Sequence, residues 1–270
     1  MDLCDFGHCD PAPPASSYYL IGEPMNLALQ TTVRDIVLEN PQAARVFESF
    51  GIDYCCGGKR PLDEACRQAN VAVDTVLEML RRPVPVEEVL DDRWNSASLK
   101  KLADHIVETH HAFVRRESPR LTGLLEKVRG RHATTHPELC RVEELFDGLA
   151  SELADHMLKE ERILFPMIKR LEEATRADGA NGASFRGIEF PIQRMIAEHD
   201  VAGEALTGIH SLTAAFQPPA DACTSFRALY QGLEEFERDL HRHIHLENNI
   251  LFPRAVTMTR TVQENGSVVH

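Results

Sequence analysis

Apolar residues recur every three or four positions through the larger, C-terminal part of the chain, which is the periodicity of amphipathic helices. Four long segments follow this pattern, at 97–129, 138–175, 184–215 and 220–258. Short breaks such as ADGANGAS and QPPADAC separate the later segments. Because the connections are this short, we predict an all-α, up-down-up-down four-helix bundle.

The chain before the bundle differs in composition. The stretch RRPVPVEEVLDDRWN combines two prolines with several charges, which is typical of a linker. Upstream of it, TTVRDIVLENPQAARVFESFGIDYCCGG predicts a capped helix, a break at Pro41, a second helix and a Gly-rich turn. We therefore expect a flexible N-terminal extension, a small helical domain, a linker, the bundle and a C-terminal tail, at 1–24, 25–82, 83–96, 97–258 and 259–270.

One motif occurs twice, as HMLKEERILFP from residue 156 and as HIHLENNILFP from residue 243. In both places a His and a Glu four residues apart interrupt the apolar stripe of their helix. Residues four apart lie one turn apart on the same side, so both side chains of each pair should face the bundle interior. The apolar members of the stripes are Leu149, Leu153, Ile163 and Met167 on the second segment and Phe236, Leu240 and Ile250 on the fourth.

A buried, unpaired carboxylate costs several kcal/mol in rough terms, so a bound cation best explains the two pairs His156 with Glu160 and His243 with Glu247. A single His-x-x-x-Glu pair is more often found on a solvated helix face. Two pairs at matching stripe positions favour metal binding. His241 lies off the stripe, as does His245, and we expect both to be solvated or to lie behind the ligands.

The first and third segments should complete the site. On the third, His199 lies on the apolar face and small residues follow it. The first offers three histidines, and periodicity alone does not choose among His105, His110 and His111. The distance from His111 to His156 along the chain is nearly that from His199 to His243, which favours His111.

The donors then comprise four histidines and two glutamates. Six protein ligands are too many for one zinc ion, which takes four, and suit two iron ions with an oxo or hydroxo bridge when oxidised. Ferritin-like sites use Glu-x-x-His pairs, and the stripes lack that spacing. The pattern therefore points away from iron storage.

The amino-acid composition limits the kinds of partner and the cellular compartment that we expect for this protein. The chain has 270 residues, 43% hydrophobic and 26% charged, as globular proteins do. A formal net charge of -13 disfavours binding to nucleic acid. No apolar run is long enough to cross a membrane and no secretory signal is visible, so we expect no membrane contact. Seven cysteines, an odd number, do not suggest a disulfide framework, and we expect a cytoplasmic protein.

The adjacent thiols of Cys55 and Cys56 precede two glycines, and we expect this turn to expose both. Thiol chemistry is one interpretation, with Cys66 as a partner, and harmless turn residues are the other. A metal finger is disfavoured because no second cysteine pair stands at finger spacing. Near the N-terminus, CDFGHC offers a less favoured metal clip, Cys4, His8 and Cys9.

HMLKEERILFPMI, EHDVAGE and HIHLENNILFPRA resemble a hemerythrin-like domain, and DYCCGGKRPLDEAC resembles the small N-terminal domain of the repair of iron centres family of di-iron proteins. The resemblance covers about residues 28–257. It implies a hemerythrin-like bundle in which both glutamates bridge two irons, and it chooses His111 on the first helix. The implied ligands are His111, His156, Glu160, His199, His243 and Glu247.

The resemblance also implies a function, which is repair or protection of iron-sulfur clusters damaged by nitric oxide or oxidants. The partners would be damaged iron-sulfur proteins, with nitric oxide or oxygen as small ligands, and we allow for a homodimer. Ferrous iron donation and nitric oxide reduction both fit, with Cys55 and Cys56 as the reactive thiols. The alternatives are a hemerythrin-like oxygen, nitric oxide or redox sensor, and a nitric oxide reductase with repair as a by-product.

Overall fold

The structure is a computed structural model that describes residues 29–40, 43–55, 57–81, 93–176 and 187–267. Within these residues the secondary structure is helical, and the β-type pairing consists of one isolated antiparallel bridge between Thr32 and Pro61. The predicted all-α class is therefore confirmed. None of the described helices has the length and apolar character needed to span a membrane.

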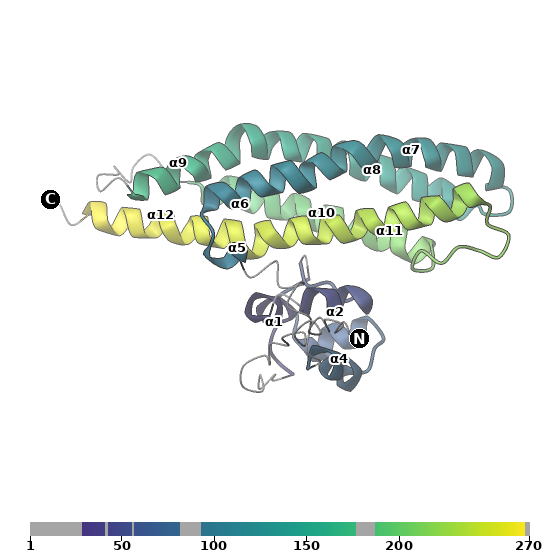
Figure 1. Cartoon of the computed structure of the whole chain (residues 1–270), viewed down its shortest axis with the longest axis horizontal. Helices are drawn as coiled ribbons and strands as arrows, with labels where there is room; N and C mark the ends of the chain where they lie inside the picture. The colour runs from purple at the N-terminus through teal and green to yellow at the C-terminus, as the bar shows by residue number, and fades with distance from the viewer. Residues whose placement is uncertain (1–28, 41–42, 56, 82–92, 177–186, 268–270) are drawn as a thin grey trace, which may run out of the picture.

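Four long helical rods lie side by side and form the bundle (Figure 1). Helix α8 packs against both α7 and α10, and α11 packs against α7. The first rod is α6 (Leu99–His105), η2 (Ile106–His111) and α7 (Ala112–His132); the second is α8 (Glu138–Lys159), η3 (Glu160–Leu164) and α9 (Phe165–Arg176). The third is α10 (Glu189–Leu212), and the fourth is α11 (Thr224–His245), η5 (Leu246–Leu251) and α12 (Phe252–Ser267).

The end of the fourth rod differs from the sequence-based expectation. Helix α12 continues to Ser267, past the expected end at residue 258. Thr259 is buried, and its hydroxyl donates a hydrogen bond to the carbonyl of Ala255. The segment expected to be a tail therefore begins as helix, because one face of it still packs on the bundle.

Three of the four rods contain a π-helical segment, namely η2, η3 and η5. A π turn holds about one residue more than an α turn, so the residues after it are rotated by roughly 100°. In the second rod Ile163 is 56% exposed, whereas Leu164 and Ile168 are buried. The placement of Ile163 on the buried stripe was thus wrong, because that stripe assumed an unbroken α-helix. Pro166 and Pro253, which have no N–H to donate, are each the second residue after the end of a π segment.

The start of the first rod is anchored to the other rods. The carboxylate of Glu172 accepts hydrogen bonds from the backbone N–H groups of Leu99 and Lys100, both at 3.0 Å, which satisfies donors at the N-terminus of α6. The guanidinium of Arg254 donates to the carbonyls of Trp94 and Ala97 at 2.9 and 2.6 Å. The short helix α5 (Arg93–Ser96) is thereby tied to α12.

Four short helices form a small unit beside the bundle (Figure 1). They are α1 (Val33–Glu39), α2 (Ala43–Ser49), α3 (Leu62–Gln68) and α4 (Val73–Leu80). Glu48 pairs with Arg242 of α11 at 3.3 Å, and the amide of Asn249 donates to the carbonyl of Tyr54 at 3.5 Å. The unit therefore rests on the rod that carries the second copy of the repeated motif. We keep the small domain at 25–82 and the start of the bundle at 97 as a proposal, whereas the end expected at 258 is replaced by the end of α12 at Ser267.

His136 links two turns at one end of the bundle. Its Nδ1 lies 3.1 Å from Glu138 and its Nε2 lies 3.1 Å from Asp221, which joins the α7–α8 turn to the α10–α11 turn. The hydrogen bond with Asp221 raises the pKa of His136, and the hydrogen bond with Glu138 adds to this. A histidine whose pKa is higher in the folded than in the unfolded protein stabilises the fold. This stabilisation is fully present below the pKa of the unfolded state, about 6.5, and is lost as the pH rises through the pKa of the folded state.

We therefore expect His136→Gln to lower Tm more at about pH 6 than at about pH 9, as measured by thermal unfolding of both proteins. Comparing the two proteins at each pH cancels the titration of the other histidines. A Tm difference that is the same at both pH values would contradict this role.

Candidate metal centre

The six expected ligand side chains converge in the middle of the bundle. All six are at most 3% exposed, and every rod supplies at least one: His111, His156, Glu160, His199, His243 and Glu247. His111 ends η2, Glu160 begins η3, and Glu247 lies in η5. Each π segment therefore carries one of these donors, which agrees with the frequent use of π turns at functional sites.

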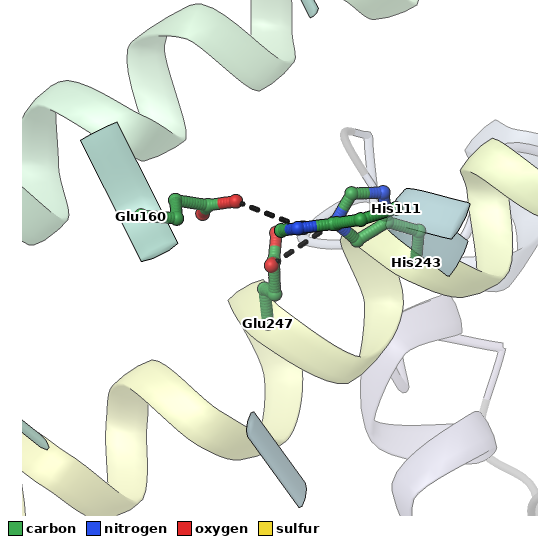
Figure 2. A group of neighbouring side chains, drawn as sticks. All are labelled: His111, Glu160, His243 and Glu247. Carbon is green, nitrogen blue, oxygen red and sulfur yellow. Dashed lines mark hydrogen bonds and ion pairs between the residues drawn. The ribbon is translucent and has the colours of Figure 1, made fainter. Parts of the chain in front are cut away.

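The donors form two sets, and within each set the ligand atoms lie within 4.8 Å of one another. The first set is His111, Glu160, His243 and Glu247, drawn in Figure 2, and the second is His156, Glu160, His199 and Glu247. Both carboxylates belong to both sets. Each set could therefore hold a metal ion, and the two sets have both carboxylates in common.

Each carboxylate divides its oxygens between the two sets. Glu160 directs Oε2 to His111 and Oε1 to His156, both at 3.3 Å from Nε2. Glu247 directs Oε1 to His243 and Oε2 to His199, both at 3.1 Å. Carboxylates placed in this way can bridge two metal ions.

The chemistry of the cluster fits bound cations. Both oxygens of Glu160 and Oε2 of Glu247 are buried without a well-formed hydrogen bond, although histidine nitrogens lie near them. The Nε2 atoms of His156 and His199 lie only 3.0 Å apart, so two lone pairs compete for one proton unless a cation stands between them. Burial lowers the pKa of His243, which favours the neutral imidazole that a metal requires.

The shared carboxylates are held as anions by the histidines around them. Burial raises the pKa of Glu247, but the nearby His243 and His199 outweigh burial and hold this pKa well below its usual range. An ionised carboxylate in a dry interior is costly unless it is compensated. Two divalent cations would supply that compensation.

Three of the four histidines have a hydrogen-bond partner on the ring nitrogen that faces away from the site. The pairs are His111 Nδ1 with Glu161 Oε1 at 2.6 Å, His156 Nδ1 with Glu198 Oε2 at 3.0 Å, and His199 Nδ1 with Asn248 Oδ1 at 2.9 Å. Such partners fix the tautomer and leave Nε2 free to bind metal. Sequence reasoning missed all three residues, although each is a direct neighbour of a donor along the chain.

Glu198 is itself firmly held. It accepts hydrogen bonds from Lys159 at 2.7 Å and from Arg194 at 3.1 Å. Burial raises the pKa of Glu198, but the hydrogen bonds from Lys159 and His156 prevail and lower this pKa to about 2. The partner of His156 is therefore an anion at every ordinary pH.

The other histidines of the first rod point elsewhere. His105 stacks on Trp94 with 4.3 Å between ring centroids, and its Nδ1 lies 3.1 Å from the hydroxyl of Thr109. His110 is bonded to Asp239 at 3.0 Å. Neither belongs to a donor set, so the geometry favours His111 as the donor from this rod.

Expectations about two side chains near the small unit were wrong. For His245, the solvated alternative is wrong: the residue is only 6% exposed and packs against Tyr54 with 5.4 Å between ring centroids. Cys55 is 5% exposed rather than displayed on the turn. Asp53 accepts hydrogen bonds from the backbone N–H of Cys55 at 3.0 Å and from its thiol at 3.3 Å. Contact with the small unit covers His245, and such a contact leaves no periodic signal in the sequence.

The thiol of Cys55 lines a cavity of about 580 Å³ between the small unit and the bundle, which Asn248 also lines. Cys66, its suggested partner, is buried in α3, and neither cysteine forms a disulfide. Cys56 lies outside the described residues, as does the suggested metal clip at 4–9.

A bundle with two His/Glu donor sets at its centre defines a hemerythrin-type metal-binding protein. Residues 102–255 match the hemerythrin HHE cation binding domain family, and residues 29–83 match a family described as a domain of unknown function (DUF542).

Similarity over most of the chain narrows the class further. The chain is 37% identical over 231 residues to a probable iron-sulfur cluster repair protein of Haemophilus influenzae, covering 84% of this chain and 97% of that protein. It is 38% identical over 222 residues to the iron-sulfur cluster repair proteins YtfE of Enterobacter sp. (strain 638) and of Escherichia coli O81, covering 82% of this chain and 94% of each. The chain belongs to this family of iron-sulfur cluster repair proteins, which is the repair of iron centres family.

The sharing of carboxylates generates a quantitative prediction. Glu247 belongs to both donor sets and His111 to only one. Glu247→Gln should therefore weaken both metal positions about ten-fold or more, whereas His111→Gln should weaken one. Metal per chain after dialysis, measured by elemental analysis, distinguishes the two cases.

Glu204→Gln, which removes an exposed carboxylate from α10, is the matched control and should keep the full metal content. Equal metal loss in Glu247→Gln and His111→Gln would exclude bridging by Glu247.

Proposed function

We propose that this protein repairs or protects iron-sulfur clusters damaged by nitrosative or oxidative stress, with two iron ions at the six buried donors. The observation that carries the proposal is the pair of donor sets that share Glu160 and Glu247. Membership in a family whose relatives carry the name of cluster repair proteins supports the substrate class. Damaged iron-sulfur proteins are then the macromolecular partners.

The donor chemistry supports iron as the metal. Each set offers two histidine nitrogens and two oxygens from the shared carboxylates, which leaves coordination positions open on octahedral ions. We propose His111 and His243 for one iron, and His156 and His199 for the other, with an oxo or hydroxo bridge in the oxidised state. Two ferrous ions would supply either iron for rebuilding a cluster or the two electrons that, with two protons, convert two nitric oxide molecules to nitrous oxide and water.

A groove between α8 and α10 supports access by small molecules. It has a volume of about 630 Å³, and its wall includes His156 and His199 of the second donor set. Leu153, Ala202 and Phe190 give part of the wall apolar character. Apolar walls favour small uncharged ligands such as nitric oxide or oxygen over charged chelators.

The position of Cys55 supports a role for the thiols next to the metal centre. Its cavity is also lined by Asn248, whose side chain is bonded to the donor His199. We propose that Cys55 and Cys56 contact iron or a client cluster, or exchange thiols, in a reducing cytoplasm. The four described cysteines form no disulfide, which is consistent with that compartment.

A sensor of oxygen, nitric oxide or redox state is the second candidate, and one observation favours it. Asn248 contacts the donor His199 while the adjacent Asn249 contacts the carbonyl of Tyr54 in the small unit. A change at the metals could therefore reach the small unit through η5. Nitric oxide reduction with repair as a by-product is the third candidate.

The deciding experiment adds the protein, loaded with ferrous ⁵⁷Fe, to a nitrosylated iron-sulfur enzyme without oxygen. Recovery of enzyme activity with ⁵⁷Fe in the rebuilt cluster, seen by Mössbauer spectroscopy, is expected for iron donation. Nitrous oxide without iron transfer would indicate nitric oxide reduction. Absence of both would reject repair and favour the sensor.

The thiols can be separated from the metals. Cys55→Ser combined with Cys56→Ser should impair recovery of the enzyme and leave the absorption of the metal centre unchanged, because the two donor sets consist of histidines and glutamates of the bundle. Cys140→Ser, at an exposed position of α8, is the control and should behave as the unaltered protein. Full repair by the double variant would show that the thiols are structural.

A further inference from the structure

His243 is the one donor histidine without a partner for its outer nitrogen among the described residues. Its Nε2 lies 3.1 Å from Glu247, while its Nδ1 is buried and makes no hydrogen bond. The outer nitrogens of the other three donor histidines are all bonded to a carboxylate or an amide. When Nε2 binds a metal ion, the ring proton of the neutral imidazole sits on Nδ1. A buried N–H without an acceptor is unfavourable, so an acceptor should stand close to this atom.

A matching acceptor lies one helical turn away. Asp239 precedes His243 by four residues on α11, which puts both side chains on one side of the helix. Its Oδ1 is bonded to Nδ1 of His110 at 3.0 Å, whereas its Oδ2 is buried and has no partner. One helix face thus holds an unpaired buried donor and an unpaired buried acceptor.

His110 brings the two groups together. Its ring stacks on the ring of His243, with 5.7 Å between centroids and 11° between planes, while its Nδ1 holds the Asp239 carboxylate. The side chain of His110 is only 7% exposed, and that of Asp239 is 18% exposed. The pair is therefore a built feature of the interior beside the metal centre rather than a surface contact.

We propose that Asp239 is the positioning residue for His243, and that its Oδ2 accepts the Nδ1–H of His243 through one bound water molecule. A water molecule with polar partners on both sides is a common way to satisfy buried groups that are not directly bonded. His110 keeps the carboxylate in place. The inference rests on the proposed di-iron site.

The assignment makes the two metal positions unequal. In the first set both histidines are then backed by carboxylates, His111 by Glu161 and His243 by Asp239. In the second set His156 is backed by Glu198, but His199 is backed only by the neutral amide of Asn248. A carboxylate partner strengthens imidazole as a ligand, so the first iron should be the retained one.

The second position also lies on the wall of the α8–α10 groove, which His156 and His199 line. The donor set with the weaker ligands, His156 and His199, is therefore also the one that can be reached from the groove. We infer that the iron held by His156 and His199 is the one that the protein gives up first.

Iron release from the diferrous protein to an excess of ferrous chelator tests this assignment. The unaltered protein should release its irons in two phases of equal amplitude. Asp239→Asn should accelerate the slow phase about ten-fold or more and leave the fast phase unchanged. Glu198→Gln should accelerate only the fast phase, because Glu198 supports the other set.

Two further variants sharpen the test. His110→Phe keeps an aromatic ring on His243 but removes the hydrogen bond that holds Asp239. It should therefore accelerate the slow phase by a smaller factor than Asp239→Asn does. This variant replaces Asp239→Asn in the test if Asp239→Asn does not fold. Glu237→Gln is the matched control, because it removes a carboxylate of the same helix that is bonded to His210 instead, and it should release iron as the unaltered protein does.

Proton NMR of the diferrous protein gives a readout that a purely structural role would not move. The shifted Nδ1–H signal of His243 should exchange with deuterium faster in Asp239→Asn, while the signals of the other three histidines stay unchanged. Unchanged release and exchange in Asp239→Asn, or equal acceleration of both phases, would overturn the proposal. If the unaltered protein holds one metal ion, the proposed di-iron function fails, and the exchange of the His243 signal still decides the role of Asp239.

Discussion

Two ionised carboxylates buried at the centre of the bundle set the main constraint on this structure. Glu160 and Glu247 are fully buried, and each divides its oxygens between two groups of histidines. Their charge cannot be left uncompensated in a dry interior. The same buried charges that destabilise the metal-free bundle therefore give it the capacity to bind cations. All four rods must meet at this point, because each supplies at least one of the donors.

The rods meet that requirement through local distortion and external support. The π segments η2, η3 and η5 each contribute a donor and turn the residues beyond it onto a new face. Glu161, Glu198 and Asn248 then hold the histidines from behind. Because these partners differ in charge, the two donor sets differ in their surroundings, although the repeated motif that contributes to both is nearly symmetric in sequence.

Segment η5 also connects the metal centre to the small unit. Glu247 and Asn248 act on the site, and the adjacent Asn249 reaches His245 and the carbonyl of Tyr54. Burial lowers the pKa of His245 to about 4, so this contact is made by a neutral ring. The cavity that holds the Cys55 thiol adjoins the same segment. The small unit is thus placed so that Cys55 lines the same cavity as Asn248, whose side chain is bonded to the donor His199.

The sequence by itself determined the bundle and most of its centre. Helical periodicity revealed the four rods, and a polar pair at matching places in two apolar stripes revealed His156, Glu160, His243 and Glu247, because burial of such pairs leaves a periodic signal. His199 followed from its apolar face, whereas His111 needed chain spacing and a family resemblance. Only the tertiary structure decided that Ile163 faces outward, that Cys55 is buried, and that His110 stacks on His243 while bonded to Asp239. The physical reason is that a π turn rotates the face of a helix and a docked unit covers a surface, and neither event changes the spacing of residues along the chain.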